Sequence, residues 1–198
     1  MIQDRPKAVR DGYAPAPFFF CQTTDRGDTR LVAWTGTVLS QRTVLEALVL
    51  QLPSRVELVL KVWLESDDLV DESGAMVAEW RRYDGVASRG ALLEALSRCE
   101  GLIFRDGRSQ LCVRHPRTRD YIVFDEYGVF YVYSNAPAFR AVFVTHGFVE
   151  REEPLIADGT CWRTQPPDGR AAEAEFVRLL RLEPMPAPGA AHPSSAVH

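Results

Sequence analysis

Two adjacent carboxylates, Asp125 and Glu126, lie between two strongly apolar runs in the stretch "RDYIVFDEYGVFYVYS" (residues 119–134). Paired carboxyl groups can act in general acid–base catalysis, so this stretch is the first candidate for chemistry. An Asp followed three residues later by Gly, here Gly128, is however typical of a tight turn that closes through a left-handed glycine. Neighbouring carboxylates also project apart. We therefore predict a turn that Asp125 caps, and we assign no catalytic residue.

The strand register around this turn places three tyrosines on one face. If residues 125–128 form the turn, Tyr121 pairs with Tyr133 across the hairpin, and Val123 pairs with Tyr131. The alternate residues then form the core face: Ile122, Phe124, Phe130 and Val132. Tyrosine hydroxyls need water or a partner. We therefore expect the stripe of Tyr121, Tyr131 and Tyr133 to be covered by a helix or to bind a partner, and we take it as a candidate binding surface.

A second candidate is an acidic segment, "ESDDLVDESG" (residues 65–74). Its four candidate binding residues are Asp67, Asp68, Asp71 and Glu72. Such a cluster could hold a divalent cation, but the spacing lacks the glycine and the terminal glutamate of an EF-hand loop. We predict an exposed loop whose charge attracts a basic protein partner.

Other residues that could do chemistry do not form a motif. The four cysteines are scattered along the chain: Cys21, Cys99, Cys112 and Cys161. They form no CxxC and lie near no Cys/His cluster, so we expect neither a metal site nor a redox dithiol. His146 is expected at a helix C-terminus, where an imidazolium complements the helix dipole, and His115 in a turn. No phosphate-cradling loop or GxSxG motif is present, so we expect no cofactor.

Composition narrows the class of protein. A chain of 198 residues with 46% hydrophobic residues is the size of one domain. The net charge of −4 argues against a general binder of nucleic acids or anionic membranes, which normally carries a basic excess. No apolar run reaches the length of about 20 residues that spans a bilayer, and the N-terminus lacks the apolar core of a signal peptide. We expect a cytoplasmic protein with reduced thiols.

Both ends of the chain have the composition of disordered segments. Residues 1–17 are polar and interrupted by prolines, and residues 184–198 combine Pro, Ala, Ser and Gly with little to bury. We therefore predict one domain over residues 18–183.

The first half of this domain is expected to mix strands and helices. Aromatic and β-branched runs at residues 18–24 and 30–38 predict a hairpin. A capping box of Thr43 and Glu46 predicts a helix that ends before Pro53. Period-2 alternation predicts a half-buried strand over residues 55–64, with Glu57 and Lys61 on its polar face. After the acidic segment, residues 75–83 are interpreted as a short helix.

The second half is expected to begin with a helix capped by Ser88 that ends near Gly101. Four strand-like runs follow, at residues 101–105, 108–114, 120–124 and 129–134, and predict an antiparallel four-stranded meander. A helix from Pro137 to Gly147, a short strand at residues 159–164 and a helix capped by Asp168 complete the chain. The fold class is therefore α+β, with helices packed on a largely antiparallel sheet.

The order "YIVFDEYGVFYVYS", a helix ending in "HGF", then "CWR" and a final amphipathic helix resembles small bacterial α+β proteins of the immunity-protein type, which neutralise toxins by binding them. The resemblance covers about the C-terminal third of the chain. It implies a protein that acts by binding rather than by catalysis. We therefore predict a non-enzymatic, cytoplasmic protein-binding module, with the alternative of a hydrolase or nuclease whose site assembles only in three dimensions.

Overall fold

The structure is a computed structural model that describes residues 7–9, 15–24, 27, 29–64, 80–153 and 162–185. Its main sheet contains β2 (Phe18–Thr23), β3 (Thr29–Trp34), β4 (Arg55–Trp63), β5 (Trp80–Ser88), β6 (Ser109–Arg114), β7 (Tyr121–Phe124), β8 (Val129–Tyr133), β9 (Val149–Glu150) and β11 (Glu183–Pro184). The helices are α1 (Val38–Leu50), α2 (Arg89–Arg98), α3 (Pro137–Thr145) and α4 (Gly169–Leu180), with one π-helical turn, η2 (Gly101–Arg105). Two short strands, β1 (Ala8–Val9) and β10 (Trp162–Arg163), pair separately.

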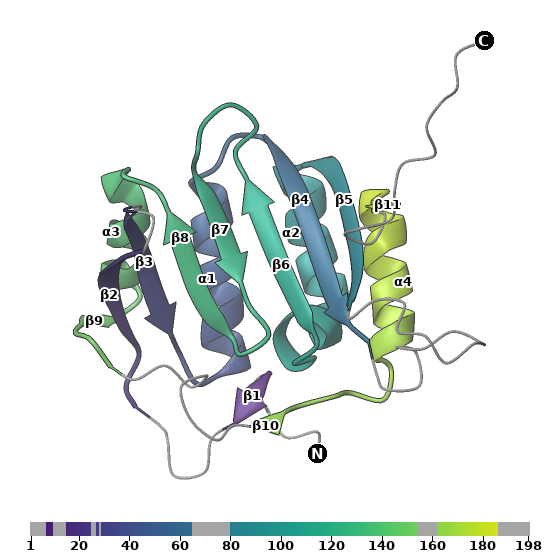
Figure 1. The fold of residues 1–198 in the computed structure, drawn as a ribbon, viewed down its shortest axis with the longest axis horizontal. Helices are drawn as coiled ribbons and strands as arrows, with labels where there is room; N and C mark the ends of the chain where they lie inside the picture. The colour runs from purple at the N-terminus through teal and green to yellow at the C-terminus, as the bar shows by residue number, and fades with distance from the viewer. Residues whose placement is uncertain are drawn as a thin grey trace.

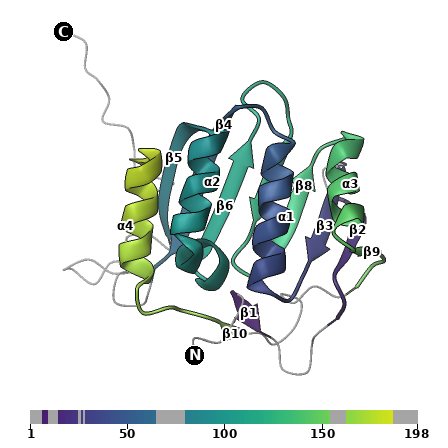
Figure 2. The same cartoon turned by 180° about the vertical axis from the view of Figure 1, so that it is seen from behind.

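The main sheet has nine strands in the order β11-β5-β4-β6-β7-β8-β3-β2-β9. Neighbouring strands are antiparallel, except that β9 runs parallel to β2. All four α-helices of the described residues lie on one side of this sheet, and the β1–β10 pair lies at one end of it (Figures 1 and 2). The predicted α+β class with a largely antiparallel sheet is confirmed. The opposite face of the sheet, which we call the open face, carries no described helix.

Period-2 alternation along β4 explains this one-sided arrangement. Its buried side chains are Val56, Leu58, Leu60 and Val62, all in the core under the helices. The residues between them, including Glu57 and Lys61, are only partly buried and point to the open face. The strand therefore places charged groups on the open face while it contributes four apolar side chains to the core.

The predicted start of the first helix is wrong. α1 begins after Thr37, whose Oγ1 accepts a hydrogen bond from Ser40 N at 3.2 Å. Thr43 instead lies inside the helix, where its hydroxyl donates to Leu39 O. Both threonines have the residue type of an N-cap, but the buried stripe already includes Val38, and this packing extends the helix by more than one turn.

The predicted four-stranded meander is a meander of three strands, β6, β7 and β8. Residues 101–105 form η2 instead, and Leu102, Ile103 and Phe104 are all fully buried there. Three successive buried side chains suit a helical turn enclosed by the core, whereas a half-buried strand would alternate. A short apolar run does not by itself distinguish these two structures.

The helix predicted over residues 75–83 is also wrong where the structure describes it, because Trp80 begins β5. β5 lacks an apolar and polar alternation because two of its helix-facing side chains, Arg81 and Tyr83, are polar. Arg81 Nε and Tyr83 Oη each lie within hydrogen-bond distance, 2.8 and 2.9 Å, of Oε1 of the buried Glu173 on α4. Residues 75–79 lie outside the described part of the chain.

Several local predictions are confirmed. β2 and β3 form the predicted antiparallel pair, and Ser88 caps α2 by accepting from Ala91 N at 3.1 Å. α3 begins at Pro137 and ends before Gly147, which has φ of +78°. The next residue, Phe148, donates its N–H to Phe143 O, as expected for a Schellman-type helix end. Phe176 and Leu180 form the buried stripe of α4, with Ala172 and Leu179 partly buried beside the core.

Structured residues lie beyond both boundaries of the predicted domain, residues 18 and 183. Lys7–Val9 lies inside the segment 1–17, and Lys7 is fully buried. At the other end, β11 reaches residue 184 and pairs with β5.

Candidate functional site

The carboxylate pair at residues 125 and 126 belongs to a tight turn between β7 and β8. Oδ1 of Asp125 accepts hydrogen bonds from Tyr127 N at 2.9 Å and from Val129 N at 2.8 Å. Gly128 has φ of +75° and donates its N–H to Asp125 O. The side chain of Asp125 thus holds the turn together, and it is almost completely buried. The predicted turn and the predicted register of β7 and β8 are confirmed.

A buried lysine from the N-terminal segment lies next to this turn. Lys7 Nζ donates to Ser109 O at 2.6 Å and to Asp125 O at 3.1 Å, and it lies 4.5 Å from the centre of the Phe124 ring. Burial lowers the pKa of the Lys7 ammonium to about 7 and raises the pKa of the Asp125 carboxyl to about 7. These two groups therefore titrate together near neutral pH, inside the protein and out of reach of a substrate.

This geometry predicts how an Asp125→Asn variant depends on pH. The pKa of Asp125 is higher in the folded than in the unfolded state, so its contribution to stability is complete below about pH 4 and is lost as the pH rises to about 7. Asparagine keeps the oxygen that accepts from Tyr127 N but cannot titrate. Denaturant unfolding between pH 4 and 7 should therefore show the wild type losing stability relative to the variant. Parallel curves for the two proteins would contradict the buried position of this carboxyl.

A buried ion pair lies at the same end of the sheet as Lys7 and the turn between β7 and β8. Asp106 is fully buried and Arg108 nearly so, and Arg108 Nη2 lies 2.8 Å from Asp106 Oδ2. Between them, Gly107 donates its N–H to Thr164 O, and an added Cβ would come within 2.6 Å of Lys7 O. Asp106 and Gly107 therefore lie in close contact with the β1–β10 pair, and the turn that they begin joins η2 to β6.

Three rows of side chains cross the open face at right angles to the strands. Directly paired residues share a face. The central row contains Asp84, Val59, Cys112, Val123, Tyr131, Val32 and Phe20. On one side of it, the Glu57 row contains Val86, Glu57, Arg114, Tyr121 and Tyr133. On the other side, the Lys61 row contains Arg82, Lys61 and Gln110.

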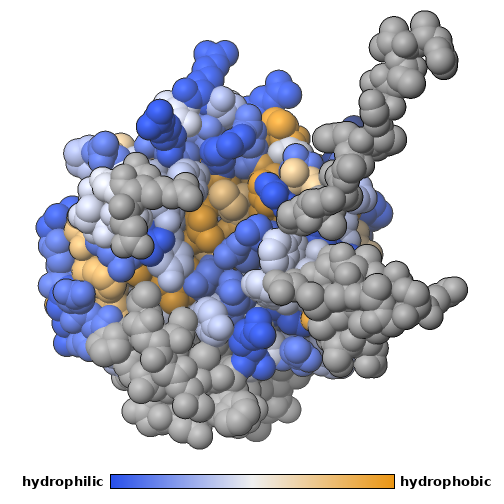
Figure 3. Space-filling model, in the orientation of Figure 1, coloured by the Kyte–Doolittle hydropathy of each residue, from blue (hydrophilic) through white to orange (hydrophobic). Residues whose placement is uncertain are grey.

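The open face thus has an apolar middle between two polar margins, which Figure 3 shows as an orange area flanked by blue side chains. Towards β2 and β3, the central row joins a second apolar cluster that is separate from the main core. Its buried members are Phe18, Phe20, Val32, Trp34 and Val129. The open face is therefore not a uniformly polar surface.

The predicted tyrosine stripe lies on this open face. The rings of Tyr121 and Tyr133 stack with their centres 4.2 Å apart. Arg30 donates a hydrogen bond to Tyr133 Oη, and its guanidinium carbon lies 4.4 Å from the centre of the Tyr131 ring. Gln22 Oε1 accepts from Arg30 Nε at 2.9 Å and so holds the guanidinium in place. Sequence reasoning placed the tyrosines correctly but did not identify Arg30.

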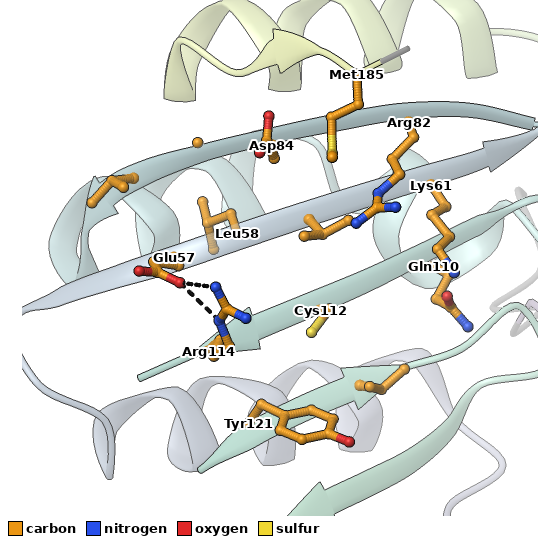
Figure 4. Close-up of a pocket in the computed structure, with 14 residues that line it drawn as sticks. Glu57, Leu58, Lys61, Arg82, Asp84, Gln110, Cys112, Arg114, Tyr121 and Met185 are labelled. Atoms are coloured by element: carbon orange, nitrogen blue, oxygen red, sulfur yellow. Dashed lines mark hydrogen bonds and ion pairs between the residues drawn. The ribbon is translucent and has the colours of Figure 1, made fainter. Parts of the chain in front are cut away.

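A groove of about 810 Å³ follows the open face from β5 to β7 (Figure 4). One end holds an ion pair in which Arg114 donates to Glu57 Oε2. The other end brings together the residues of the Lys61 row, with Cys112 between the two ends. A second hollow of about 520 Å³ continues past Arg114 and Tyr121 towards the loop that contains Arg119.

The second predicted binding site, the acidic segment, lies outside the residues that the structure describes. The acidic residues Asp67, Asp68, Asp71 and Glu72 lie in residues 65–79, outside the described residues. His115 Nδ1 accepts from Arg117 N and Thr118 N in its turn, and His146 ends α3, as the sequence indicates. In the part of the chain that the structure describes, no three His, Cys, Asp or Glu side chains are arranged to hold a metal ion.

Fold and groove together define the class: an α+β protein whose helices cover one side of an antiparallel sheet and whose other side carries an aromatic and charged groove. None of the described helices has the length and apolar character of a membrane span. Comparisons of the chain with protein-family models, with curated proteins and with solved structures find no match.

Proposed function

We propose that this chain is a non-enzymatic, cytoplasmic protein-binding module and that a protein partner binds to the open face of its sheet. The observation that carries the proposal is the group of Tyr121, Tyr131 and Tyr133 around Arg30 on a face without a described helix. Tyrosine and arginine are enriched among the residues that contribute most to protein–protein binding. Stacking and hydrogen bonding already order these side chains, so a partner would immobilise little additional freedom.

The extent of the face supports a macromolecular partner. The groove and the second hollow share Arg114 and Tyr121, so the two lie next to each other on the open face. Its middle is apolar and its margins are polar, which is the usual anatomy of a protein interface. An inhibitor or immunity protein, the class that the C-terminal third resembles, would use such a surface to cover its target.

The charge of the partner is a separate question. The expectation of a basic partner rests on the acidic segment at residues 65–74, outside the described residues. On the described open face, Arg30, Lys61 and Arg82 accompany only a few acidic groups, so this face by itself does not favour a basic partner.

The alternative function, a hydrolase or nuclease, would need acid, base or nucleophilic groups that converge. No histidine is among the described residues that line the groove, and Glu57 there is ion-paired with Arg114. Burial also raises the pKa of the Cys112 thiol, which makes it a weaker nucleophile at neutral pH. These observations favour binding over catalysis.

Site-specific photo-crosslinking tests the proposal. Benzoylphenylalanine in place of Tyr121 should give an adduct with one defined protein in cells of the native host, whereas the same residue in place of Val144 should not. Val144 is the control because it is 58% exposed on α3, in the helix layer. Against the partner so found, Tyr121→Ala should weaken binding about tenfold, as for an interface residue worth more than 1 kcal/mol. Equal adducts at both positions, or none from Tyr121, would contradict this use of the open face.

A further inference from the structure

The Lys61 row holds two cations that have no acidic partner among the described residues. Lys61 and Arg82 are directly opposite each other across β4 and β5. Among the residues that the structure describes, neither forms an ion pair. The only contact described for the ammonium is with an aromatic ring, since Lys61 Nζ lies 5.6 Å from the centre of the Trp80 ring. Like charges directly opposite each other destabilise a sheet. An anion bound between Lys61 and Arg82 would reduce the repulsion between them.

One of these cations, Arg82, also has a buried hydrogen-bond donor without an acceptor among the described residues. Arg82 Nε is buried and has no hydrogen-bond acceptor in the described part of the protein. An unsatisfied buried donor destabilises the fold. Beside it, Gln110 donates only a long hydrogen bond, 3.4 Å, to Glu126 Oε2. Figure 4 shows the side chains of Lys61, Arg82 and Gln110 gathered at one end of the groove.

The opposite end of the groove differs in this respect. Arg114 is there, but Glu57 satisfies its charge through Nε and Nη2. Asp84 lies two residues from Arg82 along β5, beside Val59 in the central row, and would repel an anion from that side. Among the described residues of the groove, the cations without an ion-pair partner are therefore Lys61 and Arg82, at the end that also holds Gln110.

Apolar side chains lie next to these cations. Val59 is two residues from Lys61 on β4, and the central row continues from it through Cys112 and Val123. All three line the groove, as does Met185. A volume of about 810 Å³ lies in the range of small-molecule sites, which combine an apolar lining with a few polar groups.

We infer that the groove binds a small amphiphilic anion, with a carboxylate or phosphate between Lys61 and Arg82 and an apolar body across Val59, Cys112 and Val123. The guanidinium of Arg82 offers planar paired donors to an oxyanion, and the ammonium of Lys61 adds a second charge. This ligand site goes beyond the proposed function and does not depend on it, because the isolated chain can bind a small molecule in the groove, although that molecule and a protein partner would compete for Tyr121.

Calorimetric titration with two probes of equal chain length and opposite charge tests the inference. Decanoate should bind, and decyltrimethylammonium should bind at least tenfold more weakly. The double variant Lys61→Gln/Arg82→Gln should reduce decanoate affinity at least tenfold, whereas Arg98→Gln, which removes an exposed cation on α2, should not. Decyl phosphate in place of decanoate identifies the preferred head group, and binding of either supports the site.

Two further readouts separate ligand binding from changes in folding. Because Trp80 lies beside Lys61, decanoate should alter tryptophan fluorescence, and Trp80→Phe should remove most of that signal while calorimetric binding persists. Thermal unfolding of the double variant should occur at the wild-type temperature or above it, because both side chains are partly exposed and the change removes two opposed like charges. Equal affinity for the two probes, or unchanged decanoate affinity in a folded double variant, would overturn the inference.

Discussion

Replacing Phe124 by alanine is expected to lower the free energy of unfolding by about 3 to 5 kcal/mol, because the ring is fully buried and its removal leaves a cavity. The ring lies 4.7 Å from Phe130 and 5.6 Å from Phe104, measured between ring centres. It also faces the ammonium of Lys7 at 4.5 Å, so its loss removes one of the groups that hold the N-terminal segment. Denaturant unfolding at one pH measures the effect directly.

The adjacent residue provides the control. Val123 is on the same strand but points to the open face and is only partly buried, so Val123→Ala should cost much less. A near-neutral effect of Phe124→Ala, or an equal effect of both changes, would show that the two faces of β7 are assigned the wrong way round.

This register could be predicted because its determinants are local. Asp125 and Gly128 fix the turn within four residues, and the pairing of every residue on β7 and β8 follows from the turn. The same reasoning identifies the ends of α3 from Pro137 and Gly147. In each case, two or three residues close in the sequence determine the structure.

Errors arose where distant residues decide the structure. Nothing near β5 indicates that Arg81 and Tyr83 surround Glu173, which follows about ninety residues later. Lys7 is buried through bonds to Ser109 and Asp125, both more than one hundred residues away. Its own neighbours have the composition of a disordered segment. Tertiary contacts outweighed local propensity at both positions.

The residues of the candidate site also fall into two groups, those that local sequence predicts and those that depend on distant strands. Alternation on one hairpin predicted where Tyr121, Tyr131 and Tyr133 would lie. The sequence also placed Lys61 on the polar face of its strand. That Lys61 lies opposite Arg82 could not be predicted, because residues 75–83 were interpreted as a helix and the pairing of β4 with β5 was therefore missed. One strand of a cross-strand site can be predicted from alternation, whereas its partner requires the topology.

Replacing Asp106 by alanine should destabilise the fold by about 3 to 5 kcal/mol, the usual effect of removing one member of a buried ion pair. The carboxylate of Asp106 accepts from Arg108 N at 2.9 Å, from Arg108 Nε at 3.0 Å and from Arg108 Nη2 at 2.8 Å. Without it, the guanidinium stays buried beside Gly169, the first residue of α4, where an added Cβ would come within 2.3 Å of Arg108 Nη2. The change should therefore weaken the start of α4 together with the contact to the β1–β10 pair.

Two comparisons make this prediction specific to a buried charge. Glu94→Ala removes an exposed carboxylate 3.7 Å from Arg98 and should change stability by less than about 1 kcal/mol. The double variant Asp106→Leu/Arg108→Met removes both charges, and it should recover part of the stability that Asp106→Ala loses, because the buried guanidinium is removed together with the carboxylate. If the double variant were no more stable than Asp106→Ala, the backbone hydrogen bond from Arg108 N, which both variants lose, would account for the destabilisation in place of the buried charge.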